Sequence, residues 1–469
     1  MKARHRGPVM PPSRLTIGRP PRQHAGANGV ERGRMTKAWR VDVLECRGSS
    51  HDVGKQLAEA FLKTTRGRAF ARRKERRPFA FSLRNAEAAF KAWAPNIWEE
   101  LHGFADGLKI PLERAVAEYA NGRLRYPPRG CSAVMSAGLY GRNYDYDVRR
   151  YDRILVAVQP KGVHASIGFS DRFTGRVDGM NEHGLCVGLH QVSEAAARPG
   201  LVCILIVRIV LDQCATTRET VALLRRIPHG LSFNYSLMDA GGSAAVVEAS
   251  PAAVVVREGG QLGCSNHFLS PAQQAFNRRN PGSYRRLPAL EKFASEQLAA
   301  DRLFKALNDS LSPVFDHRYS AGSGTLHTIV CTPAERRIQI GVGGDATPSS
   351  IDFGSWVRGR PLGLEALTGQ LGGTAKPFDP GGRRVIAKSG GGAGKVFIGT
   401  PLDNALFKDL TLANASFANV SLAGARFDDI DFSNTVITSN CNFNGMQIAG
   451  VGVKELLAVY ARHRRGEQA

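Results

Sequence analysis

Residues 129–145 read RGCSAVMSAGLYGRNYD, and within this stretch the patterning of the chain changes. Apolar side chains recur at helical spacing between Asn85 and Tyr119, whereas from Cys131 onward they alternate with a period of two. We therefore predict a strand over Cys131 to Met135, a turn over residues 136–138 and a returning strand over Leu139 to Val148. The two strands form a hairpin that begins at a cysteine.

Further hairpins follow this first one. Alternating segments flank the turns at residues 160–162 and 181–184, residues 203–227 have helical patterning, and more strands are expected between Phe233 and Val342. Many hairpins and few helices, without alternating strand–helix units, predict an α+β fold in which antiparallel sheets are covered by helices. We expect this domain to span residues 35–345.

The composition describes a folded globular protein with a basic excess. The chain has 469 residues, of which 43% are hydrophobic and 22% charged, and its formal net charge is +22. Much of the excess lies in residues 1–34, residues 66–77 and the last few residues, as is typical of solvated arms. Because no helix-turn-helix, zinc finger or aromatic-basic strand pattern accompanies the charge, we expect no specific nucleic-acid binding.

The N-terminal residues 1–34 are rich in Arg, Pro and Gly and lack periodicity, which predicts a disordered basic extension. Translation starts at either Met1 or Met35. The longest apolar stretch, Leu201 to Leu211, is interrupted by Arg208 and is too short to span a bilayer. We expect neither membrane insertion nor a signal peptide.

Eight cysteines are scattered along the chain, without a CxxC pair or a histidine cluster at metal-ligand spacing. This distribution predicts neither a disulfide framework nor a zinc site. A reducing cytoplasm fits it best, and no cofactor is expected.

The C-terminal part differs from the rest. Residues 346–398 are rich in Gly and Pro and are predicted to be a linker. Within residues 399–465, large apolar residues then recur every fifth position, at Phe407, Leu412, Phe417, Leu422, Phe427, Phe432 and Ile437. This period resembles the pentapeptide-repeat family and implies a short right-handed β-helix. An amphipathic helix over Val453 to His463 is expected to cap it, and a protein partner is expected to bind this module.

Cys131 is the candidate nucleophile. It follows Gly130 at the start of a strand, and Arg142 and Asp145 lie on the strand that returns beside it, within reach across the hairpin. A buried structural cysteine is the alternative reading of the same pattern.

Several segments resemble, in order, the N-terminal-nucleophile hydrolases of the isopenicillin N acyltransferase (acyl-CoA:6-aminopenicillanate acyltransferase) and choloylglycine hydrolase type. The resemblance covers residues 37–345 and implies an αββα sandwich of two antiparallel sheets between helices. The segments are Glu99 to Gly107, Gly130-Cys131, Gly141 to Asp145, Gly179 to Leu185, Asn234 to Asp239, Val247 to Pro251, Ser265 to Phe268 and Leu326 to Thr328.

The residue types then suggest the chemistry. Cys131 would attack the carbonyl of Gly130, the chain would be cut between residues 130 and 131, and the new α-amino group would serve as the base beside the thiol. Asp145 is expected to hold this amino group, and Arg142 to orient the thiolate and lower its pKa. An exposed cross-strand ion pair is the alternative for these two residues.

Three further site residues are implied by the resemblance. Asn266 resembles the asparagine that donates to the oxyanion, although a turn asparagine is the alternative. His190 stands where the bile-salt branch has asparagine; its backbone N–H is the expected donor, and the departure argues against bile-salt specificity. Arg286, or its neighbour Arg285, resembles a further arginine of the site.

We therefore predict a self-processing amidohydrolase or acyltransferase for linear amides such as N-acyl amines or penicillin-like compounds. Its partner is a small-molecule amide or acyl donor, and acyl-CoA would enter only as a substrate. Whether water or an amine accepts the acyl group stays open. The alternatives are a non-catalytic interaction protein that uses the repeat module and basic surface, and a nucleic-acid-associated protein that uses its arginine-rich arms.

Overall fold

The structure is a computed structural model that describes residues 38–73, 81–120, 130–192, 199–277, 280–319, 322–371, 443–448 and 450–464. The predicted basic extension over residues 1–34 lies outside the described residues. So do the seven repeat positions from Phe407 to Ile437, and the pentapeptide-repeat β-helix therefore stays a prediction.

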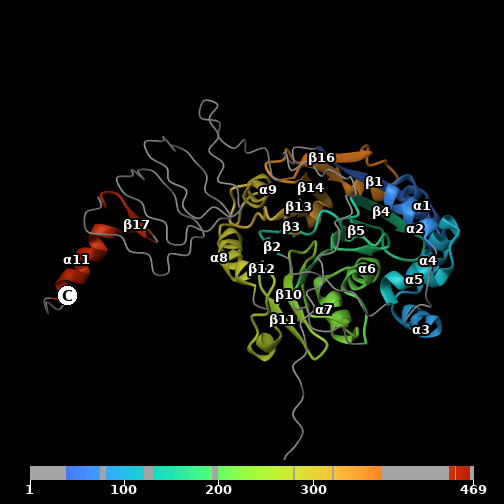
Figure 1. Cartoon of the computed structure of the whole chain (residues 1–469), viewed down its shortest axis with the longest axis horizontal. Helices are drawn as coiled ribbons and strands as arrows, with labels where there is room; N and C mark the ends of the chain where they lie inside the picture. Colours follow the sequence, from blue (N-terminus) through green and yellow to red (C-terminus); the bar gives the residue numbers. More distant parts are fainter. Residues whose placement is uncertain are drawn as a thin grey trace, which may run out of the picture.

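Two sheets form the centre of the fold (Figure 1). The larger sheet has the order β11 (Val254–Glu258), β10 (Ala244–Ala249), β9 (Phe233–Met238), β8 (Cys186–Gln191), β7 (Asp178–Asn181), β5 (Ser166–Asp171), β4 (Ile154–Pro160), β1 (Ala38–Gly48) and β16 (Ala366–Gln370), with β6 (Gly175–Arg176) beside β5. The smaller sheet has the order β12 (Gln261–Cys264), β2 (Cys131–Ser136), β3 (Leu139–Asp145), β13 (Thr325–Thr332), β14 (Arg337–Val342) and β15 (Ser349–Asp352).

The strand pairs are antiparallel, as expected, except for β1 and β4, which run parallel. Strand β1 lies between β4 and β16, so the start of the described chain is hydrogen-bonded on both sides to segments far along the sequence.

Helices cover the outer face of each sheet (Figure 1). The smaller sheet packs against α8 (Pro281–Ser295) and α9 (Ala300–Asn308), and the larger sheet against α6 (Cys203–Gln213), α7 (Thr217–Arg226) and α1 (Ser50–Lys63). Helix α1 packs against α2 (Thr65–Arg72) and α4 (Pro95–Leu108), and α3 (Leu83–Trp93) and α5 (Leu112–Ala120) pack against α4. The layers are therefore helix, sheet, sheet, helix, which agrees with the α+β class predicted from the sequence.

Local sequence explains how α1 begins and packs. Ser49 and Asp52 form a capping box, in which each side chain accepts a hydrogen bond from the backbone of the other. Helix α4 packs so closely against α1 at Gly54 that a Cβ there would lie 1.9 Å from the carbonyl oxygen of Glu100. Only glycine allows this contact between the two helices.

The linker predicted over residues 346–398 begins too early. Residues 349–370 include β15, α10 (Phe353–Val357) and β16, which extend both sheets. Phe353 and Trp356 are fully buried, so this segment belongs to the packed core. The glycines and prolines around it made the sequence look like a linker. The domain therefore continues to residue 371, and the rest of the predicted linker lies outside the described residues.

The C-terminal residues that are described form β17 (Gln447–Ile448), β18 (Val451–Gly452) and α11 (Val453–Arg464). The helix predicted to start at Val453 is confirmed, whereas its capping role stays a prediction. No helix in the described ranges combines the length and the apolar character needed to cross a bilayer.

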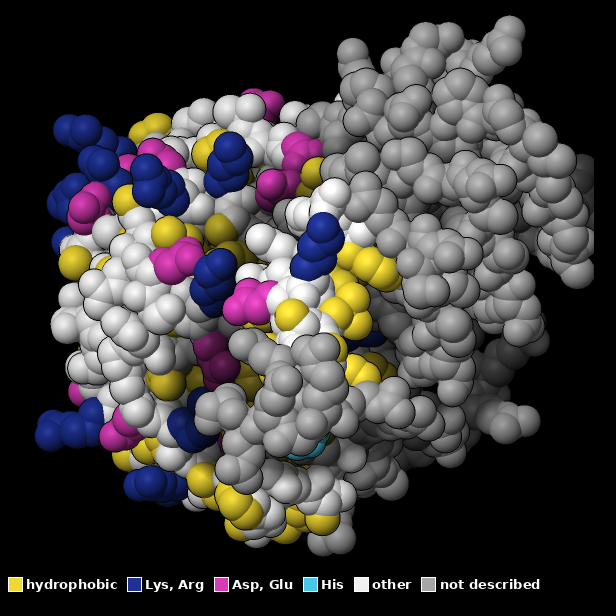
Figure 2. Space-filling model, turned by 90° about the vertical axis from the view of Figure 1, so that its left-hand side faces the viewer, with side chains coloured by type: hydrophobic (Ala, Val, Ile, Leu, Met, Phe, Trp, Pro, Cys, Tyr) yellow, Lys and Arg dark blue, Asp and Glu magenta, His cyan; other side chains and the backbone are white. Residues whose placement is uncertain are grey.

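Figure 2 shows one face of the molecule, on which the described Lys and Arg side chains are scattered among acidic and apolar ones. On this face the described basic residues do not merge into one continuous patch.

Candidate active site

Cys131 is the first residue of β2, and the predicted hairpin is confirmed. Cys131 lies opposite Tyr144 of β3, and Ala133 lies opposite Arg142. Residues 131, 133 and 142 therefore share the face that looks into the core between the sheets. The side chain of Cys131 is 3% exposed, so it is buried in the intact chain.

The backbone nitrogen of Cys131 is held by Asn266. The N–H donates to Oδ1 of Asn266 over 2.7 Å, and Nη2 of Arg286 donates to the same oxygen over 2.8 Å. The Nδ2 group of Asn266 donates to the carbonyl of Gln191 over 2.9 Å. In the intact chain Asn266 thus binds the nitrogen of Cys131 rather than an oxyanion, and its oxyanion role stays a prediction.

Helix α8 sets the position of Asn266. Ser283 in its first turn accepts the Asn266 N–H on Oγ at 2.7 Å and contacts Nδ1 of His267 at 2.7 Å. One turn later, Arg286 donates from Nε to Oγ of Ser132 over 3.1 Å. Arg286 is therefore the one of the two candidate arginines that lies beside Ser132 and Asn266, whereas the side chain of Arg285 is exposed; the site role of Arg286 stays a prediction.

The backbone at Gly130 packs closely against the guanidinium group of Arg286. A Cβ at residue 130 would lie 2.5 Å from Nη1 and 2.7 Å from Cζ of Arg286. Any larger residue would push Arg286 away, so the glycine before the cysteine keeps a donor-rich cation next to the Gly130–Cys131 peptide bond.

Arg142 is fully buried between the sheets and charged. Its Nε donates to Oδ2 of Asp178 over 2.9 Å, and its Nη1 lies 3.1 Å from Nε2 of His190. Burial raises the pKa of the Cys131 thiol, while the charge of Arg142 opposes this rise. Burial has the larger effect on the pKa of this thiol, and the role of Arg142 in orienting a thiolate stays a prediction.

Asp178 was missed by the sequence analysis, although it directly precedes the segment that begins at Gly179. His327 Nε2 lies 3.0 Å from the same Oδ2 that binds Arg142, and Nδ1 of His327 lies 2.9 Å from the Tyr151 hydroxyl. Burial favours a raised pKa for Asp178, but His327 and Arg142 hold that pKa below its usual value. The sequence held no direct signal for this pairing, because Arg142 and Asp178 are 36 residues apart and lie on different sheets.

Asp145 lies on the opposite face of β3 from Arg142, following the alternation of the strand. Its Oδ1 accepts from the Thr325 hydroxyl over 2.7 Å, and Oδ2 has no hydrogen-bond partner among the described residues. Its backbone carbonyl is 4.0 Å from Sγ of Cys131. Burial, followed by the charge of Asp316, raises the pKa of Asp145 to about 7.

His190 joins the site through its side chain. Burial, then the charge of Arg142, lowers the pKa of His190 well below its usual value, so the ring is neutral. Because Arg142 can only donate, Nε2 of His190 is the acceptor, and the Ser236 hydroxyl at 2.8 Å can donate to it as well. The fold therefore gathers Cys131, Arg142, His190, Asn266 and Arg286, with Asp145 behind the strand.

Part of the chain is similar to a known protein family. Residues 134–347 match the model of the family described as acyl-coenzyme A:6-aminopenicillanic acid acyl-transferase. The match covers somewhat less than half of the chain. A search of the curated proteins finds no significant match.

Solved structures with partial similarity include a mutant conjugated bile acid hydrolase from Clostridium perfringens. It is 15% identical, covers 51% of this chain and 96% of its own, and has a TM-score of 0.35. Penicillin V acylase from Agrobacterium tumefaciens is 17% identical over 47% of this chain and 86% of its own, with a TM-score of 0.30. An N-acylethanolamine-hydrolyzing acid amidase orthologue from Caenorhabditis elegans is 16% identical over 44% of this chain and 93% of its own, with a TM-score of 0.33.

Proposed function

We propose that the chain is a self-processing enzyme that uses Cys131 as an N-terminal nucleophile and cleaves or transfers acyl groups at linear amide bonds. One observation carries the proposal. The nitrogen of Cys131, which scission would turn into a free amine, donates to Asn266 over 2.7 Å, and Arg286 fixes the same oxygen over 2.8 Å. The helix–sheet–sheet–helix layers and the family match over residues 134–347 support it.

The first step is an exchange within the chain. Sγ of Cys131 attacks the carbonyl carbon of Gly130, the C–N bond breaks, and the thiol proton moves to the nitrogen of Cys131. Water then opens the thioester, which leaves a carboxylate on Gly130 and restores the thiol. We infer that Arg286, whose guanidinium lies beside Gly130, stabilises the negative oxygen that develops on this carbonyl.

The freed nitrogen then acts as the base for turnover. It takes the thiol proton while Sγ attacks the amide carbonyl of a substrate, and it returns that proton to the departing amine. Asn266 keeps the amine beside the sulfur, and Asp145, on the strand paired with that of Cys131, is the proposed counter-charge for the protonated amine. Arg142 favours the thiolate once the sulfur is exposed.

The substrates follow from a thioester acyl-enzyme. We infer an N-acyl amine or a penicillin-like amide as acyl donor, with water or an amine as acceptor. An acyl-CoA can also donate, because exchange between two thioesters is nearly neutral in energy. Since Cys131 is 3% exposed before scission, substrate reaches it only after the two new chain ends separate.

Intact-mass and N-terminal analysis of the purified protein tests the proposal. We expect a chain that begins at Cys131, and Cys131→Ala should remain whole. Cys264→Ala is the matched control, since Cys264 is also fully buried and lies on the neighbouring strand opposite Ala133. A wild-type chain that stays whole, or a Cys131→Ala chain that is still cut after Gly130, would contradict the proposal.

A further inference from the structure

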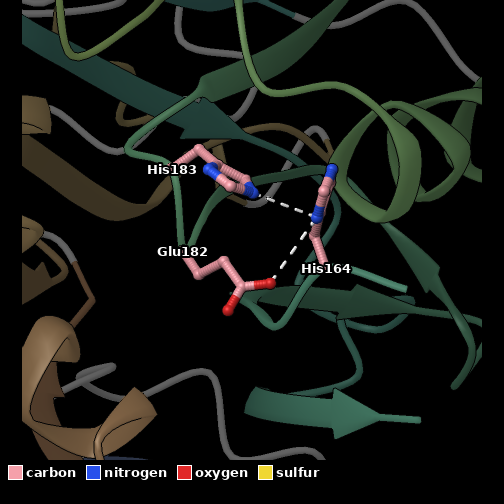
Figure 3. Close-up of side chains that lie close together, drawn as sticks. All are labelled: His164, Glu182 and His183. Carbon is pink, nitrogen blue, oxygen red and sulfur yellow. Dashed lines mark hydrogen bonds and ion pairs between the residues drawn. The ribbon is translucent and has the colours of Figure 1, made fainter. Parts of the chain in front are cut away.

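A second cluster of reactive side chains lies away from Cys131. His164 follows β4, and Glu182 and His183 form the turn between β7 and β8 (Figure 3). His190 of the active site lies near the other end of β8, and the strand between Cys186 and His190 alone spans about 13 Å. The cluster is therefore separate from the thiol.

The three side chains converge on one point (Figure 3). Nε2 of His183 is 3.1 Å from Nδ1 of His164, and Nδ1 of His164 is 3.5 Å from Oε1 of Glu182. All three ligand atoms lie within 4.8 Å of one another. Ligands about 2.0–2.1 Å from a tetrahedral zinc ion are about 3.3 Å apart, so two of the edges already have the required length.

The backbone that carries these ligands is fixed by buried contacts. Oδ1 of Asn181 accepts from the N–H groups of His183 and Leu185, both over 3.1 Å. Nδ2 of Asn181 donates to the carbonyls of Leu211 and Cys214. The turn is thus anchored to α6 without using the histidine rings or the carboxylate of Glu182.

Contacts of Glu182 and Gly184 also fix the position of the turn. Oε1 of Glu182 accepts the N–H of Ala165 over 3.0 Å, which ties the turn to the segment of His164. Gly184 has φ +81°, and a Cβ there would lie 2.3 Å from the carbonyl oxygen of Pro333. Both ligand-bearing segments are therefore positioned before any ion binds, which lowers the entropy cost of binding.

A hollow of about 310 Å³ adjoins the cluster. Glu182 and His183 line it together with Arg336 and Arg358. Three protein ligands leave a fourth position on a tetrahedral ion. The two guanidinium groups disfavour a bare dication but favour an anion bound to it, so the hollow suits an anionic fourth ligand.

We propose that His164, Glu182 and His183 form a binding site for a borderline divalent transition-metal ion such as Zn²⁺, with an anion from solution as the fourth ligand. Two imidazoles and one carboxylate form the ligand set that such ions prefer. A purely structural contact needs only one histidine and one carboxylate, as in His51 and Asp106 at 2.9 Å. In this cluster, a ring nitrogen of His183 also contacts a ring nitrogen of His164.

Calorimetric titration of the chelator-treated full-length protein with Zn²⁺ tests the site. We expect one ion per chain, and His164→Asn and His183→Asn should each weaken binding at least tenfold. Glu182→Gln keeps an acceptor for the Ala165 N–H and should weaken binding similarly. His51→Asn is the matched control and should bind as the wild type does.

Two readouts separate this site from the cysteines and from misfolding. Co²⁺ should give visible ligand-field bands without a thiolate charge-transfer band, and Zn²⁺ should raise the Tm of the wild type but not of the His164→Asn/His183→Asn double variant. Scission before Cys131 should proceed equally in all variants. Absence of Zn²⁺ binding, a thiolate band, or unchanged affinity in the double variant would overturn the site.

Discussion

Arg142 and Asp178 form an ion pair across the two sheets, with Nε and Oδ2 2.9 Å apart and both side chains fully buried. Arg142 comes from β3 of the smaller sheet and Asp178 from β7 of the larger one. Because neither charge reaches solvent, each depends on the other for compensation. The pair therefore aligns the strand next to Cys131 with the opposite sheet.

Asp178→Asn should destabilise the fold by about 3–5 kcal/mol, because it leaves the guanidinium of Arg142 buried without a counter-charge. Denaturant unfolding in a Cys131→Ala background, which keeps the chain whole, measures this loss. Asp42→Asn is the control, since Asp42 pairs with Arg40 on the surface and should cost less than about 1 kcal/mol. Equal losses in the two variants would argue against a structural role for the buried pair.

Arg286→Lys should slow scission at least tenfold. A lysine ammonium lacks the planar fork that reaches Ser132 and Asn266 together, so the acceptor of the Cys131 N–H loosens. The rate at which the chain beginning at Cys131 appears, followed by mass spectrometry on newly synthesised protein, reports the effect. Arg285→Lys on the exposed neighbouring position should cleave at the wild-type rate.

Gly130→Ala should fold but process slowly. The new methyl group would meet the end of the Arg286 side chain, which can move, rather than backbone, which cannot. Circular dichroism should match the wild type while the precursor accumulates on denaturing gels. Gly260→Ala is the control, because a Cβ at Gly260 would have no atom within 4 Å. Normal processing of Gly130→Ala would show that the contact with Arg286 is not needed.

Asp145 should make stability depend on pH. Its pKa is raised to about 7 in the folded chain from a usual value of 3.8, so the stability it contributes is fully present below pH 4 and is lost as the pH rises towards 7. The loss is on the order of 4 kcal/mol. Unfolding free energies of Cys131→Ala and Cys131→Ala/Asp145→Asn, compared from pH 4 to 8, should show a difference that changes in this window and is flat above it.

A carboxylate with the opposite shift provides the contrast. The Ser49 side chain and backbone hold the pKa of Asp52 below its usual value, so its contribution is present at neutral pH and disappears as the medium becomes acidic. Asp52→Asn should therefore differ from the parent at neutral pH and converge with it in acid. The same direction of pH dependence for both aspartates would contradict the assignment for Asp145.

The hairpin and the layers could be predicted because period-two alternation and turn residues are local signals. Cys131 to Val134 alternate between the inter-sheet core and the α8 side, and Ala137 and Gly138 both have positive φ, as a tight hairpin turn requires. The end of the domain could not be located in this way, because β15 and β16 are short and stand among glycines and prolines.

Site residues could be predicted where the residue type itself suggests a chemical role. They were harder to predict where the role depends on tertiary contacts. Cys131, Arg142 and Arg286 come together as expected, but the face of β3 that carries Asp145 depends on strand register. The contacts of Asp178 with Arg142 and His327 depend on how the two sheets stack, which the sequence does not give. The approach of His164 to His183 likewise joins two hairpin turns that are 19 residues apart in sequence.

The placement of β1 between β4 and β16 has a further consequence for a chain cut after Gly130. The liberated N-terminal piece would contribute an interior strand to a sheet built otherwise from the other piece, with α1 packed against that strand and α4 against α1. Such a nicked molecule should run as one particle in gel filtration and as two bands after denaturation. The pieces should not refold to activity when they are separated and then mixed, because β1 of the larger sheet lies on one piece and its remaining strands lie on the other.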